Sequence, residues 1–112
     1  MPADIKHFID EAVNSFVMWD LLIYFSKKED ELTSPTKIAQ RLGRPLEEVQ
    51  KPIQKLEKLG LVVLEKLLDG ELNCRIIKQS SFFPDLKKFE VYNESQESRL
   101  KILSYLLRKK IH

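Results

Sequence analysis

The stretch RPLEEVQKPIQKLEKLGLV, residues 44–62, changes its apolar spacing part-way along. Its first part has apolar side chains at helical intervals, with charged side chains between them. These apolar positions are Leu46, Val49, Ile53 and Leu56. We expect a helix that begins at Pro45 and ends at Gly60, with a β-strand directly after it.

Pro52 lies inside this expected helix. A proline there removes one backbone hydrogen bond and clashes with the carbonyl four residues back, at about 3 kcal/mol if the clash is unrelieved. The apolar stripe passes through Pro52 without a change of phase, so we expect one kinked helix rather than two. A tolerated bend explains the residue more simply than a functional hinge.

The residues before this stretch predict two further helices. The first covers residues 8–27 and has apolar side chains on two sides: Ile9, Ala12, Phe16, Trp19 and Ile23 on one, and Met18, Leu22 and Phe25 on the other. The second is short, with Ser34 as its N-cap, Pro35 in its first turn and Gly43 at a left-handed end. Its buried side is formed by Ile38, Ala39 and Leu42.

After Gly60 the apolar period changes from 3.6 to 2, which predicts a β-hairpin. We expect strands near residues 61–67 and 72–78, because Asp69-Gly70 between two apolar runs favours a tight turn. Such a turn places Leu68 opposite Glu71.

Two helical segments are expected after the hairpin. A short helical turn should follow Pro84, and Asn93 should cap a last helix that covers residues 93–112. The negative end of the dipole of this last helix suits its basic C-terminal residues. These residues are Arg108, Lys109 and Lys110.

The last helix has two apolar stripes, like the first. One stripe is expected to close the core of its own chain, and it consists of Leu100, Leu103, Leu107 and Ile111. The opposite stripe and the second side of the first helix are then uncovered, which predicts a symmetric homodimer. The dimerisation residues are Met18, Leu22, Phe25, Ile102, Tyr105 and Leu106. Alternatively, these two sides cover each other within one chain.

The composition is that of an ordinary globular domain. The chain has 112 residues, is 43% hydrophobic and 32% charged, and has 19 basic against 17 acidic residues, for a net charge of +2. Cys74 is the only cysteine, so no internal disulfide forms, and we expect it to be buried and inert. We also expect a cytoplasmic protein, since no signal pattern opens the sequence and the longest apolar run is about half of a membrane span.

The string KIAQRLGRPLEEVQKPIQKLEKLGLVV, residues 37–63, resembles winged helix-turn-helix transcriptional regulators of the ArsR and MarR types. The resemblance covers roughly residues 12–78. It implies one mainly α domain over residues 1–112 with a small β-hairpin: a three-helix core and wing over about 8–78, and an extra C-terminal dimerisation helix over about 93–112. The positions that fall on the pattern are Ile38, Ala39, Leu42, Gly43, Val49, Ile53, Leu56, Gly60, Leu61 and Val62.

The resemblance implies that the helix after Pro45 enters the major groove of double-stranded DNA. Three lysines and a glutamine in its outward sector suit phosphates and base edges. Glu47 would be repelled by phosphates unless it pairs with Lys51 one turn on, and Glu48 suits the helix dipole in the first turn. The candidate DNA-binding residues are Lys37, Arg41, Arg44, Glu47, Gln50, Lys51, Gln54, Lys55, Lys58, Lys66 and Arg75.

The wing departs from the family pattern, because its tip is Asp69-Gly70-Glu71 where wings usually present Arg or Lys. This departure and Glu47 favour an alternative function. In the alternative the winged helix is an interaction module, such as an adaptor or small subunit, without sequence-specific DNA binding. The sequence has no nucleophile motif, no phosphate-binding glycine loop and no metal-sensing cysteine pair, so we expect neither an enzyme nor a cofactor or metal site.

Overall fold

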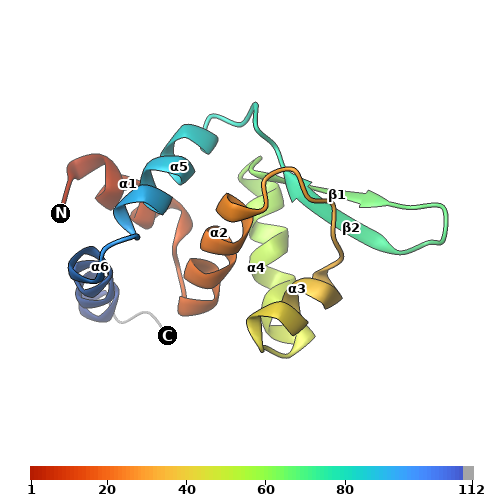
Figure 1. Cartoon of the computed structure of the whole chain (residues 1–112), viewed down its shortest axis with the longest axis horizontal. Coiled ribbons are helices and arrows are strands. Elements are labelled where there is room, and N and C mark those ends of the chain that lie inside the picture. Colours follow the sequence, from red (N-terminus) through yellow and green to blue (C-terminus); the bar gives the residue numbers. More distant parts are fainter. Residues whose placement is uncertain (110–112) are drawn as a thin grey trace.

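The computed structural model describes residues 1–109, so the expectations for Lys110 and Ile111 lie outside the described residues. Within residues 1–109 the chain forms six helices and one two-stranded hairpin, in an envelope of 44 × 29 × 22 Å (Figure 1). The predicted mainly helical fold with one hairpin is confirmed. The elements are α1 (Ala3–Ala12), α2 (Phe16–Lys27), α3 (Pro35–Leu42), α4 (Leu46–Lys58), β1 (Val62–Lys66), β2 (Leu72–Ile76), α5 (Phe83–Tyr92) and α6 (Gln96–Arg108).

The prediction of one first helix over residues 8–27 is wrong, because the segment contains the end of α1 and the whole of α2. Val13 and Ser15, between these helices, have extended backbones. The hydroxyl of Ser15 accepts a hydrogen bond from the amide of Met18 at 3.0 Å and so begins a new helix.

The predicted ends of α3 are confirmed. Ser34 caps the helix by accepting from the amide of Lys37, Pro35 occupies the first turn, and Gly43 ends it with a left-handed φ of 67°. α4 continues through Pro52 as one helix, as predicted, and Val49, Ile53 and Leu56 form its buried side.

The hairpin is confirmed, with a register one residue away from the prediction. β1 and β2 are antiparallel, and Lys66 pairs with Leu72. The amide of Leu67 donates to the carbonyl of Glu71 at 2.9 Å, so Leu67, rather than Leu68, lies opposite Glu71. The turn has three residues, 68–70, and Gly70 supplies the left-handed φ of 84° that ends such a turn.

The C-terminal part differs from the prediction in two respects. The expected short turn after Pro84 is a full helix, α5. Asn93 does not cap the last helix: Ser95 caps α6 by accepting from the amide of Ser98, and Asn93 ends α5. The side chain of Asn93 instead accepts a hydrogen bond from Nε1 of Trp19 at 2.9 Å, which joins the α5–α6 turn to α2.

The core forms around α2, which contacts α4 on one side and α5 on the other. α1 packs on α5, where the rings of Phe8 and Phe89 lie 5.3 Å apart. In Figure 1, α1, α5 and α6 lie at one end of the molecule, and α3 and the hairpin lie toward the other. The buried side chains of these helices and of the hairpin thus form one shared apolar core.

Candidate nucleic-acid interface

The outward face of α4 is polar and exposed. Its core side chains fix the rotation of the helix, which turns Glu47, Gln50, Lys51, Gln54 and Lys58 to solvent. Lys55 is half-buried, so it is less available than the sequence suggested. α3 packs against α4, and the two helices are joined by the short turn that begins at Gly43.

The exposed face of α4 adjoins the hairpin. Gln50 and Gln54 of α4, Leu64 of β1 and Leu72 of β2 line a small cavity of about 80 Å³, together with Pro35 at the start of α3. The amide side chains of α4 therefore lie in the angle between α3 and the strands. A polymer that follows the face of α4 would meet the hairpin at Leu64 and Leu72.

The three arginines among the candidate residues are engaged with acidic side chains. Arg41 pairs with Glu31 and also donates to Tyr24 Oη at 2.6 Å. Arg75 pairs with Glu65 across the hairpin at 3.0 Å. Since an ion pair offsets the positive charge of each guanidinium, these residues contribute less to a basic surface than their number suggests.

Arg44 is held more firmly than the other two arginines. It binds Asp20 of α2 and, at 3.4 Å, Glu48 of α4. These carboxylates raise the pKa of the Arg44 guanidinium, with the Asp20 hydrogen bond as the largest cause. Glu48 therefore pairs with Arg44 as well as lying in the first turn of α4, where an acidic side chain interacts favourably with the helix dipole.

The lysines of the candidate surface carry its free positive charge. Within residues 1–109 none of them forms an ion pair, and they are Lys37 on α3, Lys51, Lys55 and Lys58 on α4, and Lys66 on β1. The pair between Glu47 and Lys51 that would offset the repulsion from phosphates is not formed among the described residues. Glu47 thus remains an exposed negative charge near the start of α4.

The tip of the hairpin is apolar and acidic. Leu68 is fully exposed, and Leu67 and Leu72 are also exposed. Asp69 stabilises the turn, since its carboxylate accepts from the amide of Glu71 at 2.9 Å. The acidic residues of the tip were predicted from the sequence, whereas the exposure of the three leucines was not, although all three are apolar residues beside the predicted turn.

The predicted dimerisation residues lie elsewhere than expected. Five of the six are buried in the chain itself, and they are Met18, Leu22, Phe25, Ile102 and Leu106. Tyr105 is half-buried and donates to Asp10 of α1 at 2.7 Å. The stripe of α6 that was expected to close the core is instead outward: Leu100 and Leu107 are 56% and 57% exposed. The two faces of α6 were therefore assigned in reverse.

The described residues offer neither a reactive thiol nor a cluster of metal ligands. Cys74 is buried on β2, its thiol lies 3.3 Å from the carbonyl of Thr33, and burial raises its pKa to about 12. Among residues 1–109 no three His, Cys, Asp or Glu side chains come together as a metal site would require. None of the helices in that part of the chain has both the length and the apolar character needed to cross a membrane.

Solved structures with the same arrangement come from several organisms. A possible transcriptional regulator from Methanosarcina mazei superposes with a TM-score of 0.56 and 14% identity, over 95% of this chain and 84% of that one. A double mutant of ZitR from Lactococcus lactis gives 0.54 and 16%, over 85% and 71%. BpsR from Bordetella bronchiseptica, whose DNA binding is regulated by 6-hydroxynicotinic acid, gives 0.51 and 13%, over 96% and 82%.

The chain shares its fold with these three proteins. No protein-family model matches the sequence, and no curated protein matches it. At identities of 13–16% the likeness concerns the fold alone, and the assignment to the ArsR or MarR type stays a prediction. The unpaired lysines of this chain lie on α3, on α4 and on the hairpin.

Proposed function

We propose that the protein is a DNA-binding transcriptional regulator of the winged-helix type that acts as a homodimer in the cytoplasm. One observation carries the proposal: the outward face of α4 combines unpaired Lys51 and Lys58 with exposed Gln50 and Gln54. Ammonium groups bind phosphates, and glutamine amides can bind both the acceptor and the donor of an adenine edge. α4 is thus the recognition helix, with Lys37 on α3 and Lys66 on β1 as backbone contacts.

Glu47 has a defined place in this arrangement. Its carboxylate is exposed near the first turn of α4, where residues of a recognition helix meet base edges. A carboxylate there repels phosphates but accepts a hydrogen bond from a cytosine amino group. Glu47 therefore acts in base selection and lowers the affinity for other sequences.

The homodimer forms through the outward stripe of α6. Leu100, Leu103 and Leu107 follow one another at intervals of three and four residues, the spacing of a helix–helix seam. Leu100 and Leu107 are more than half exposed in the single chain. An antiparallel pairing about a twofold axis places Leu100 of one chain opposite Leu107 of its partner, which buries both stripes and presents two α4 helices to one duplex.

The alternative, a protein-interaction module, is favoured by the hairpin tip. Exposed Leu67, Leu68 and Leu72 surround the acidic turn, and this combination suits the apolar surface of a protein with a basic rim better than it suits phosphates. In that function the lysines of α4 would be an ordinary solvated face.

Duplex binding by the full chain tests the two functions. Binding of a random-sequence duplex, followed by fluorescence anisotropy, should weaken steeply between low and physiological salt, because phosphate contacts release counterions. A Lys51→Gln/Lys58→Gln variant should bind more weakly at low salt and show a shallower salt slope. A Lys6→Gln/Lys88→Gln variant removes two exposed charges from α1 and α5 and should match the unchanged protein.

Absence of duplex binding by the unchanged protein at the lowest salt, with the fold intact by circular dichroism, would exclude the DNA-binding function. Equal losses in the two double variants would assign the binding to net charge rather than to α4.

A further inference from the structure

The cavity of about 80 Å³ between α3, α4 and the hairpin has a lining of two kinds. Most of the lining is aliphatic, and two amide side chains complete it. The aliphatic side chains are those of Pro35, Ile53, Leu64 and Leu72, and the amides are those of Gln50 and Gln54. Small-molecule sites usually have volumes of about 300–1,000 Å³, so this cavity fits a single chemical group rather than a whole ligand.

A molecule bound to the outward face of α4 can reach this cavity. Gln50 and Gln54 lie one helical turn apart on that face, and both are exposed. Leu72 is 49% exposed, whereas Ile53 is buried. The two amides therefore stand beside an apolar surface that is open to solvent on the hairpin side.

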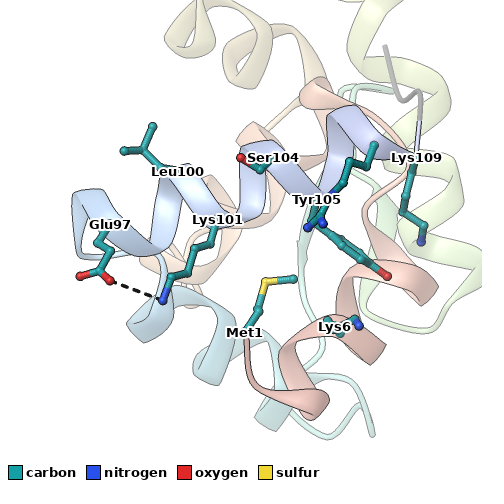
Figure 2. Close-up of a pocket in the computed structure, with 9 residues that line it drawn as sticks. Met1, Lys6, Glu97, Leu100, Lys101, Ser104, Tyr105 and Lys109 are labelled. Carbon is teal, nitrogen blue, oxygen red and sulfur yellow. Dashed lines mark ion pairs between the residues drawn. The ribbon is translucent and has the colours of Figure 1, made fainter.

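A wider groove, of about 750 Å³, lies elsewhere, between the start of α1 and α6 (Figure 2). These two helices are at the end of the molecule away from α3 and the hairpin (Figure 1). Leu100 in its wall belongs to the proposed α6 seam, so pairing of two α6 helices would cover part of this groove. The wider groove is therefore set apart from a duplex on α4, and the small cavity is the hollow that such a duplex meets.

The elements that form the small cavity also place positive charge around it. Lys37 lies in the first turn of α3, Lys51 follows Gln50 on α4, and Lys66 lies directly opposite Leu72 in the hairpin register. Cross-strand partners share one face of a hairpin, so the Lys66 ammonium is on the same face as the Leu72 side chain. Since these lysines have no ion-pair partner among residues 1–109, they are available to phosphates on both sides of a groove.

We propose that the cavity binds the 5-methyl group of a thymine, so that the protein reads an A·T pair in the major groove beside α4. Across that groove an A·T pair presents N7 and the amino group of adenine, then O4 and the methyl group of thymine. A glutamine amide matches the acceptor and donor of adenine, and the aliphatic wall matches the methyl group. The inference rests on the proposed DNA-binding function, and in it Leu72 contacts the duplex rather than a protein partner.

A cytosine in place of the thymine has a hydrogen atom at C5. The cavity then stays unfilled and its aliphatic wall stays in contact with water, which removes the favourable burial of apolar surface. Deoxyuridine differs from thymidine by the methyl group alone and keeps the pairing with adenine. Replacing thymidine by deoxyuridine therefore isolates the contact in the cavity from every other contact of the duplex.

The test begins with a duplex that the full chain selects from a random-sequence library, with affinities measured by fluorescence anisotropy at fixed salt. Each thymidine of that duplex is then replaced by deoxyuridine, one at a time. We expect at least one thymidine to lose about fourfold in affinity, the effect of exposing one methyl-sized apolar group. Thymidines outside the contact with α4 should change by less than about twofold.

Two variants locate the methyl group. Leu72→Ala shortens the aliphatic wall and should nearly remove the difference between thymidine and deoxyuridine at the sensitive position. Leu32→Ala is the matched control, because Leu32 is 41% exposed and does not line the cavity. This control should keep the fourfold difference. Each ratio compares two duplexes on the same protein, so a small change in stability cancels.

Failure of this inference and failure of the proposed function give different results. A duplex that binds with a steep salt dependence but has no thymidine sensitive to loss of its methyl group would overturn the inference and leave DNA binding intact. Equal sensitivity in the unchanged protein and in Leu72→Ala would place the methyl group outside the cavity, as would a loss of sensitivity in Leu32→Ala, and either result would overturn the inference. Recovery of no duplex at the lowest salt would overturn both.

Discussion

Arg44 donates two hydrogen bonds to one oxygen of Asp20, with Nε at 3.0 Å and Nη2 at 2.7 Å from Oδ2. Arg44 lies in the turn between α3 and α4, and Asp20 is the one acidic residue within α2. The contact fixes the turn against α2 and accounts for a carboxylate in an otherwise apolar helix. It also withholds one cation from the surface proposed to bind DNA.

Replacing Asp20 by alanine should release this cation. We expect Asp20→Ala to tighten duplex binding by a few fold at low salt, because Arg44 becomes more available to a phosphate. The loss of stability should stay below about 1 kcal/mol, since both side chains are partly exposed. Glu94→Ala removes the same charge from the α5–α6 turn and serves as the control in the same anisotropy assay. Equal affinities of the two variants would show that Arg44 does not contact DNA.

Replacing two neighbouring leucines of α6 by glutamate should affect folding in one case and dimerisation in the other. Leu106 is fully buried and Leu107 is 57% exposed. Leu106→Glu places a charge in the core and should destabilise the monomer by several kcal/mol or prevent folding. Leu107→Glu should leave the fold intact and convert the proposed dimer into a 13.2 kDa monomer, measured by light scattering and a thermal melt. A dimer that survives both Leu100→Glu and Leu107→Glu would exclude the α6 seam.

Removing the proline from α4 should stabilise the protein. Pro52 is half-buried within a continuous helix and cannot donate to the carbonyl of Glu48. Pro52→Ala restores this donor, and we expect a gain of about 2 kcal/mol after the greater freedom of the unfolded chain is included. Chemical denaturation of both proteins measures the change. A loss of stability would mean that the packing of the ring outweighs the missing hydrogen bond.

The contact between Glu31 and Arg41 should make stability depend on pH. The hydrogen bond from Arg41 lowers the pKa of the Glu31 carboxyl. A lowered folded-state pKa contributes stability that is fully present above the ordinary value of about 4.3 and is lost as the pH falls through the lowered value. Glu31→Gln should therefore melt below the unchanged protein at pH 7, and the gap should close in strong acid. Glu57→Gln, an exposed carboxylate on α4, should show no such gap; a gap for Glu31→Gln that persists at pH 2 would contradict an ionic origin.

Local signals in the sequence predicted much of the fold. The Ser34-Pro35 start and the Gly43 end of α3 are properties of single residues, and they act in the same way in any fold. The change of period after Gly60 likewise predicted the hairpin. The register was wrong by one residue because Asp69-Gly70 fits both a two-residue turn and the last two positions of a three-residue turn.

The parts that were not predicted depend on tertiary contacts. The apolar pattern continues from α1 into α2, so the break at Ser15 has only a capping hydroxyl to signal it. α6 has two apolar stripes of similar quality, and the contacts of Tyr105 and Lys109 with Asp10 orient the stripe of Ile102 and Leu106 inward. For the candidate surface, the sequence located the basic residues but not their partners, because Asp20 and Glu31 lie on other segments, 24 and 10 residues before their arginines.

Cys74 is a chemical probe of local opening in this protein. Its thiol is buried where the amide and carbonyl of Cys74 also pair with Thr33, at 2.7 and 3.1 Å. A thiol reagent reaches the sulfur only when β2 separates from the segment before α3, and no other cysteine competes for the reagent. The rate of labelling in native buffer therefore reports how often the hairpin detaches, and its temperature dependence distinguishes local detachment from global unfolding.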